Sequence, residues 1–195
     1  AYRRGMGWGL GSAFVYAVIQ QLLGLNSLSY VTTWQSVVAV ILLDYIVAFT
    51  VVGFAGIFRN AIKSQAAALT LGCVFVSVLR YACHVISGAT VWAGLSIPTQ
   101  AALSYSFIYN ATYMLPEAII LAVSAAYIGS VIDFREEKLR RLVRANSGVH
   151  ASAMSIVAGL VAAAAVVYDV VEVFSHLQSA ESGEFDITGL AAANW

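Results

Sequence analysis

The chain has 195 residues, of which 61% are apolar and only 10% are charged, and ten basic residues balance ten acidic ones. Soluble domains carry about 25% charged residues. This composition and a mean hydropathy of +0.83 exclude a disordered chain, a nucleic-acid binder with a basic face and an ordinary cytosolic enzyme. They predict an all-α integral membrane protein, a polytopic helix bundle. Cys73 and Cys83 lie inside apolar runs, so neither a disulfide framework nor a metal site is predicted.

Five apolar stretches are long enough to cross a bilayer, which takes roughly 20 residues per helix. They cover residues 5–25, 35–58, 66–91, 101–132 and 151–171. The fourth contains Pro116 and has room for two short helices, but we interpret it as one tilted or kinked span. The tail, residues 175–195, is expected to be a solvated external segment or a short sixth helix. All of these belong to a single transmembrane domain, residues 1–195.

Lysine and arginine fall on alternate connections between these spans. Arg3 and Arg4 precede the first span, Arg59 and Lys63 separate the second from the third, and a basic cluster lies between the fourth and the fifth. The connections 24–36 and 87–99 carry no charge. Because basic loops stay in the cytoplasm, we expect the chain to start there and to end outside or return to the cytoplasmic side.

Small residues recur on the first and fifth spans. Gly5, Gly7, Gly9 and Gly11 alternate along the first span. No strand precedes them, so they are not a dinucleotide-binding loop; we expect them to let helices pack closely. On the fifth span Ala158 and Ala162 form a similar pair, which is compatible with packing inside the bundle or against another protein.

Four ionisable residues lie at membrane depth, where such groups mark function by default. They are Asp44, Arg80, His84 and Glu117. Arg80 and His84 are four residues apart and therefore share a helix face. For Glu117, simple neutralisation of Arg80 is as well supported as a functional role. Asp44 and His84 lie toward the outer ends of their helices, which favours a binding site.

Aromatic and amide side chains collect at the same depth as Asp44 and His84. They are Tyr45, Trp92, Tyr105 and Asn110, with Tyr109 and Tyr113 nearby. Any one tyrosine or tryptophan is typical of the interfacial aromatic belt. A carboxylate, an imidazole, an amide and several rings together predict a pocket for a flat, cationic molecule with hydrogen-bonding groups.

Four segments carry a resemblance to one known family. They are Tyr2-Arg3-Arg4-Gly5, Leu42-Leu43-Asp44-Tyr45-Ile46-Val47-Ala48-Phe49, Arg80-Tyr81-Ala82-Cys83-His84 with Trp92 beyond it, and Tyr105-Ser106-Phe107-Ile108-Tyr109-Asn110 followed by Tyr113-Met114-Leu115-Pro116-Glu117. Over residues 2–135 the chain resembles the thiamine-specific S-components, of the ThiT or YuaJ type, of energy-coupling-factor vitamin transporters.

This resemblance implies a six-helix protein of the bacterial cell membrane that binds thiamine near the outer surface. It implies no enzymatic activity and no cofactor, and as partners a transmembrane coupling subunit and two ATPase subunits. The substrate-binding residues that it carries over are Asp44, Tyr45, His84, Trp92, Tyr105 and Asn110. Asp44 would face the thiazolium cation, Trp92 and Tyr105 would stack, and His84 and Asn110 would make polar contacts.

The chain departs from the family pattern at both ends. Its first four spans resemble the last four helices of the family, and a further span follows where the family ends. A circular permutation and a trimmed chain with an unrelated last helix both explain this arrangement. In the permuted case Trp195 would lie near Ala1, and Ala158 and Ala162 would be the pair that docks on the coupling subunit.

Two other functions remain open from the residues alone. One is an S-component or a secondary carrier for another small cationic or vitamin-like substrate, in which Asp44 or Glu117 would relay protons. An intramembrane enzyme would use His84 with a carboxylate as acid and base. The chain has no Gly-x-Ser-x-Gly or His-Glu-x-x-His motif, which weakens the enzyme interpretation.

Overall fold

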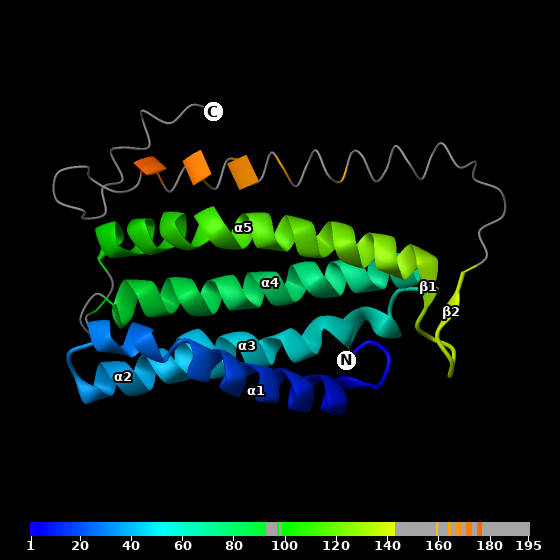
Figure 1. The fold of residues 1–195 in the computed structure, drawn as a ribbon, viewed down its shortest axis with the longest axis horizontal. Coiled ribbons are helices and arrows are strands. Elements are labelled where there is room, and N and C mark those ends of the chain that lie inside the picture. The colour runs from blue at the N-terminus through cyan, green and yellow to red at the C-terminus, as the bar shows by residue number, and fades with distance from the viewer. Residues whose placement is uncertain are drawn as a thin grey trace.

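The computed structural model describes residues 1–92, 97, 99–142 and part of the segment from 159 to 176. In that last segment the described residues are all helical, and they are Gly159, Ala164, Val167, Tyr168, Val171, Glu172, Ser175 and His176. Long helices lie side by side along one axis, and a small hairpin closes one end of the bundle (Figure 1). The predicted span 151–171 is described only at the first five of these positions. Residues 177–195 of the predicted tail lie outside the described residues, as do Ala158 and Ala162.

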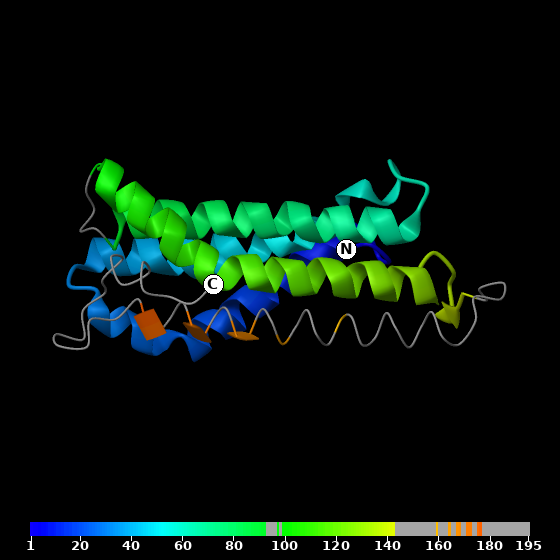
Figure 2. The ribbon, with the colours of Figure 1, turned by 90° about the horizontal axis from the view of Figure 1, so that it is seen from above.

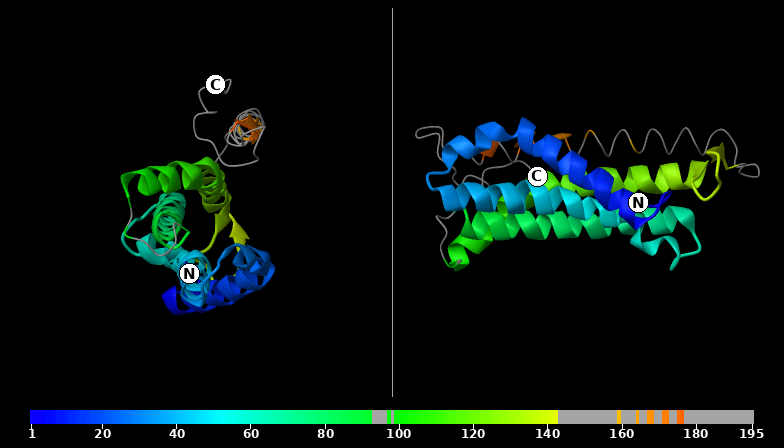
Figure 3. Two further views of the ribbon diagram at one scale, coloured as in Figure 1. Left: turned by 90° about the vertical axis from the view of Figure 1, so that its left-hand side faces the viewer. Right: turned by 90° about the horizontal axis from the view of Figure 1, so that it is seen from below.

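The N-terminal part of the bundle consists of α1 (Met6–Leu23) and the short 3₁₀ helix η1 (Leu25–Tyr30). Where we predicted a span over 5–25, α1 forms but is not among the helices apolar and long enough to cross a membrane. Its 18 residues include Gln20 and Gln21 and several glycines, which lower its hydropathy. In the right-hand view of Figure 3, α1 crosses the longer helices obliquely.

One continuous helix runs from Trp34 to Arg59, and its winding changes along its length. It begins as α2 (Trp34–Val40), widens to the π-helix η2 (Ile41–Val47), returns to α in α3 (Ala48–Thr50) and tightens to the 3₁₀ helix η3 (Val51–Arg59). The Thr33 side chain caps its start by accepting a hydrogen bond from the Ser36 amide at 3.2 Å. π-Helical turns are rare and frequently mark functional sites.

Two longer helices complete the described bundle. Ser64 caps α4 (Gln65–Thr90) and Thr99 caps α5 (Gln100–Val131), each through a side-chain oxygen. Pro116 lies inside α5, and in Figure 2 this helix changes direction partway along. The prediction of one kinked span rather than two short helices is therefore confirmed. After α5, β1 (Ile132–Asp133) pairs antiparallel with β2 (Arg140–Arg141).

Among the described residues three helices can cross a membrane by length and composition: Trp34–Arg59, Gln65–Thr90 and Gln100–Val131. Each of them corresponds to one of the predicted stretches 35–58, 66–91 and 101–132. Large apolar side chains point outward, since Trp8 and Leu23 are 72% and 75% exposed, whereas the buried positions include Ala17, Ala48 and Ala68. Small residues inside and large apolar residues outside are typical of a bundle that sits in lipid.

Small residues decide how closely the helices approach. A Cβ atom on Gly9 would lie 2.7 Å from the Gly53 carbonyl oxygen, and one on Gly72 would lie 1.9 Å from the Ala55 carbonyl oxygen. These contacts bring α1 and α4 directly against the backbone of η3. The prediction that the glycines of α1 serve helix packing holds for Gly9. For the neighbouring Gly7 and Gly11 it stays a prediction, because no atom of the described residues lies within 4 Å of a Cβ atom built there.

The predicted basic connections meet at one end of the bundle, which we term the basic end. It consists of the N-terminal residues, the end of η3, the start of α4 and the β1–β2 hairpin (Figure 1). Arg59 donates to the Arg3 carbonyl oxygen at 3.2 Å, and Arg135 donates to the Tyr2 hydroxyl at 3.2 Å. These bonds join segments that are far apart in the sequence and keep the basic residues on one side.

Candidate functional site

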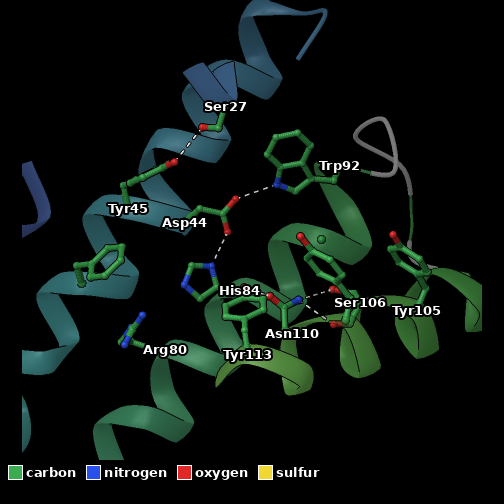
Figure 4. A pocket seen from close by; sticks show the side chains of 13 residues that line it. Ser27, Asp44, Tyr45, Arg80, His84, Trp92, Tyr105, Ser106, Asn110 and Tyr113 are labelled. Atoms are coloured by element: carbon green, nitrogen blue, oxygen red, sulfur yellow. Dashed lines mark hydrogen bonds and ion pairs between the residues drawn. The ribbon is translucent and has the colours of Figure 1, made fainter. Parts of the chain in front are cut away.

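A pocket of about 510 Å³ opens between η1, η2, α3, α4 and α5. It lies toward the end of the bundle opposite the basic end, because it is built from the starts of α2–η2 and α5 and from the end of α4 (Figures 1 and 4). We term it the aromatic pocket. Its lining residues are Ser27, Asp44, Tyr45, Phe49, Arg80, His84, Gly88, Trp92, Tyr105, Ser106, Tyr109, Asn110 and Tyr113. The structure thus brings all six sequence-predicted site residues to one cavity.

Asp44 is the acceptor around which one wall of the pocket is organised (Figure 4). Its carboxylate accepts hydrogen bonds from His84 Nδ1 at 3.0 Å, Ser87 Oγ at 2.7 Å and Trp92 Nε1 at 2.9 Å. The Asp44 and His84 side chains are 12% and 14% exposed. Because a carboxylate offers about four lone-pair positions, these three donors leave room for one further contact. The charge is held in place and stays available to a ligand.

The π-helix η2 carries both Asp44 and Tyr45 into the pocket. Tyr45 donates to the Gly24 carbonyl oxygen at 3.3 Å, and its hydroxyl lies 2.9 Å from Ser27 Oγ. Ser27 itself donates to the same carbonyl at 2.7 Å. This cluster ties the turn after α1 to the η2 wall. The η2 segment therefore contributes two consecutive residues to the lining, Asp44 and Tyr45.

Asn110 stands in the opposite wall, where it is almost completely buried. Its amide nitrogen donates to the Ser106 carbonyl oxygen at 2.8 Å and lies 3.2 Å from Ser106 Oγ, while its oxygen accepts from the Tyr113 hydroxyl at 2.5 Å. Ser106 Oγ in turn donates across to the Val85 carbonyl oxygen of α4 at 2.9 Å. The amide is thereby held in one orientation against the cavity.

Aromatic rings supply most of the remaining lining. Tyr105 and Tyr109 are stacked with centroids 6.0 Å apart and planes 3° apart, and Tyr113 meets Tyr109 edge to face at 5.8 Å. On the other side Phe49 contacts the His84 ring edge to face at 6.3 Å. Trp92 and Tyr105 are 44% and 38% exposed, so both have ring surface that a flat ligand can cover.

The Arg80 charge is neutralised beside the pocket. Arg80 Nη1 lies 2.6 Å from Glu117 Oε1, and the guanidinium carbon lies 4.7 Å from the centre of the Phe49 ring. The sequence left open whether Glu117 neutralises Arg80 or has a functional role. The structure shows the pairing of Glu117 with Arg80. Asp44 is therefore the carboxylate of the pocket lining that can supply a counter-charge to a bound cation. Among the described residues no cluster of His, Cys, Asp and Glu could hold a metal ion.

Seven lining residues were not predicted as site residues. Helical spacing could have found most of them, because each lies three or four residues from a predicted one: Phe49, Arg80, Gly88, Ser106, Tyr109 and Tyr113. Ser27 carries no such signal. It comes from η1, and its position beside Tyr45 depends on the path of the chain after α1.

The comparisons with known proteins agree with this geometry. The family model "Thiamine transporter protein (Thia_YuaJ)" matches residues 1–133. The chain is 42% identical over 92 residues to "Thiamine transporter ThiT" of Bacillus subtilis (strain 168), a match that covers 43% of this chain and 48% of that protein. The chain thus spans about half the length of this curated relative. No solved structure matches it. The family match over most of the chain, together with the three membrane-length helices, shows that this multi-pass membrane protein belongs to the thiamine transporter (Thia_YuaJ) family.

Proposed function

We propose that the chain is the thiamine-binding membrane subunit of a vitamin uptake transporter and that thiamine binds in the aromatic pocket. The observation that carries the proposal is the Asp44 carboxylate, which is shielded from solvent and surrounded by aromatic rings in a member of this family. The proposal assigns no catalytic step to the site. His84 is engaged by Asp44, where it orients the carboxylate.

Thiamine matches the lining group by group. Its thiazolium ring is a permanent cation, for which Asp44 supplies a counter-charge in a site of low dielectric. Its aminopyrimidine ring is flat, so Trp92 and Tyr105 can stack on it. Donors and acceptors on the edge of that ring suit His84 and the oriented amide of Asn110. Tyr45 completes the proposed set of substrate-binding residues, with its hydroxyl near Ser27.

The position of the pocket supports uptake from outside. Basic segments of membrane proteins stay in the cytoplasm, and here they gather at the end of the bundle opposite the aromatic pocket. The pocket would then open toward the external side. The chain has no phosphate-binding loop motif of an ATPase, so transport would need an energising partner. We propose a transmembrane coupling subunit with two ATPase subunits, docked through Ala158 and Ala162.

Tryptophan fluorescence of the detergent-purified protein tests the proposal directly. Thiamine is expected to quench the emission saturably at submicromolar concentration, because it would stack on Trp92, whereas riboflavin and biotin should have no effect. Replacing Trp92 with alanine should remove most of the quenching. The same change should weaken binding, measured by calorimetry, by about 1–3 kcal/mol through lost ring contact.

The Trp8→Phe variant is the matched control for this experiment. Trp8 is 72% exposed on α1, far from the aromatic pocket in the sequence and the fold. This variant should keep both the affinity and the thiamine-dependent part of the quenching. Full quenching in the Trp92→Ala protein would place the ligand elsewhere. Saturable binding of riboflavin with the same amplitude would argue for a different substrate.

A further inference from the structure

A second cavity, of about 340 Å³, lies at the basic end of the bundle. Its lining residues are Arg59, Asn60, Ile62, Lys63 and Arg135. Three of the five are cationic and none is acidic, and no ion pair found among the described residues involves any of them. We term this cavity the basic pocket. It has nothing in common with the lining of the aromatic pocket, so the thiamine proposal leaves it unexplained.

Neutral groups hold the two guanidinium groups of the basic pocket in place. Arg59 Nη1 donates to the Arg3 carbonyl oxygen at 3.2 Å. Arg135 donates through Nε to the Tyr2 hydroxyl at 3.2 Å and through Nη2 to the Ile62 carbonyl oxygen at 3.1 Å. These acceptors orient the groups but do not cancel their charge. A guanidinium carries five N–H donors, so donors remain on both.

Lys63 adds a third charge that is not engaged within the described part of the chain. Its side chain is exposed, and no described residue forms a hydrogen bond or an ion pair with its ammonium group. Several cations with spare N–H donors around one cavity are the usual recognition group for a phosphate. We propose that the basic pocket binds a phosphate group, carried by an anionic lipid headgroup or free in solution.

The surroundings of the basic pocket favour the lipid as the source. The pocket lies where η3 ends and α4 begins, and both segments belong to membrane-length helices. Ile57 on η3 and Leu71 on α4, a few residues away along each helix, are 46% and 47% exposed. An acyl chain can lie along such apolar side chains while its headgroup enters the pocket. Basic pockets between membrane helices on the cytoplasmic side bind lipid headgroups in this way.

The test uses the full chain in a neutral detergent and three probes. Short-chain phosphatidylglycerol, short-chain phosphatidylcholine and inorganic phosphate are each titrated at constant ionic strength, and bound ligand is followed by native mass spectrometry and by the shift in Tm. Phosphatidylglycerol is expected to bind saturably and phosphatidylcholine to bind much more weakly. Lys63→Gln should weaken phosphatidylglycerol binding roughly fivefold, as expected for one lysine at an anionic headgroup.

The matched control is Lys138→Gln, which removes a positive charge between β1 and β2 but does not line the basic pocket. It should change binding by less than about twofold, the effect of a distant screened charge. Because the Lys63 ammonium group forms no hydrogen bond or ion pair with the described residues, its variant should unfold at the unchanged Tm without lipid and bind thiamine normally. Binding of inorganic phosphate with the same Lys63 dependence, and no gain with phosphatidylglycerol, would support a phosphate site filled from solution. Equal losses in both lysine variants, or equal binding of the two lipids, would overturn the proposal.

Discussion

The Asp44→Asn protein is expected to bind thiamine about 100-fold more weakly than the unmodified protein. The change keeps the shape of the side chain but removes the negative charge that faces the thiazolium ring. It also replaces one of the two acceptor oxygens with an NH₂ group, which cannot accept the hydrogen bonds that His84, Ser87 and Trp92 donate to the carboxylate. Losing one partner of a buried charged contact costs roughly 3 kcal/mol, which corresponds to this factor. Isothermal titration calorimetry with thiamine measures the effect.

Two controls separate the charge from the geometry. Asp44→Glu keeps the carboxylate and should retain affinity within about tenfold, because the negative charge contributes more to binding than its exact position. The second control is a thiamine analogue with a neutral thiophene in place of the thiazolium. Its affinity for the Asp44→Asn protein should be close to its affinity for the unmodified protein. Unchanged affinity of that variant for thiamine itself would remove Asp44 from the site.

The Gly72→Ala protein is expected to lose about 3 kcal/mol of stability. A Cβ atom at this position would lie 1.9 Å from the Ala55 carbonyl oxygen, which is backbone and cannot rotate away. The α4 and η3 helices must therefore separate, and overpacking of this kind costs typically 1–3 kcal/mol. Thermal unfolding of the purified protein in detergent should show a Tm lower by on the order of 10 °C.

Gly11 provides the comparison for this change. It also lies inside a helix, α1, but no atom of the described part of the chain lies within 4 Å of a Cβ atom built on it. Gly11→Ala should leave the Tm unchanged or raise it slightly, since alanine favours the helix by up to about 1 kcal/mol over glycine. A Gly72→Ala protein as stable as the Gly11→Ala protein would mean that η3 and α4 do not pack as closely as described.

Much of the architecture follows from local sequence patterns. Each of the spans 35–58, 66–91 and 101–132 is apolar over a full membrane thickness, so its hydropathy is sufficient evidence for a helix. Over 5–25 the outcome differs, since α1 contains two glutamines and three glycines and is not among the helices that meet the length and hydropathy criteria. Spacing along one helix was equally informative. Arg80 and His84 both line the aromatic pocket because residues four apart share a face.

The contacts between helices depended on the tertiary structure. Sequence placed Asp44, His84 and Trp92 at one depth, but only the fold joined them through hydrogen bonds to one carboxylate. The reason is physical: helical periodicity relates residues of one helix, whereas the rotation and separation of two helices depend on packing. Here that packing includes the close contact of Gly72 with the backbone at Ala55. Hydropathy and residue type are enough to predict a membrane helix bundle with a set of residues suited to a cation, whereas the packing of the helices selects which of those residues meet.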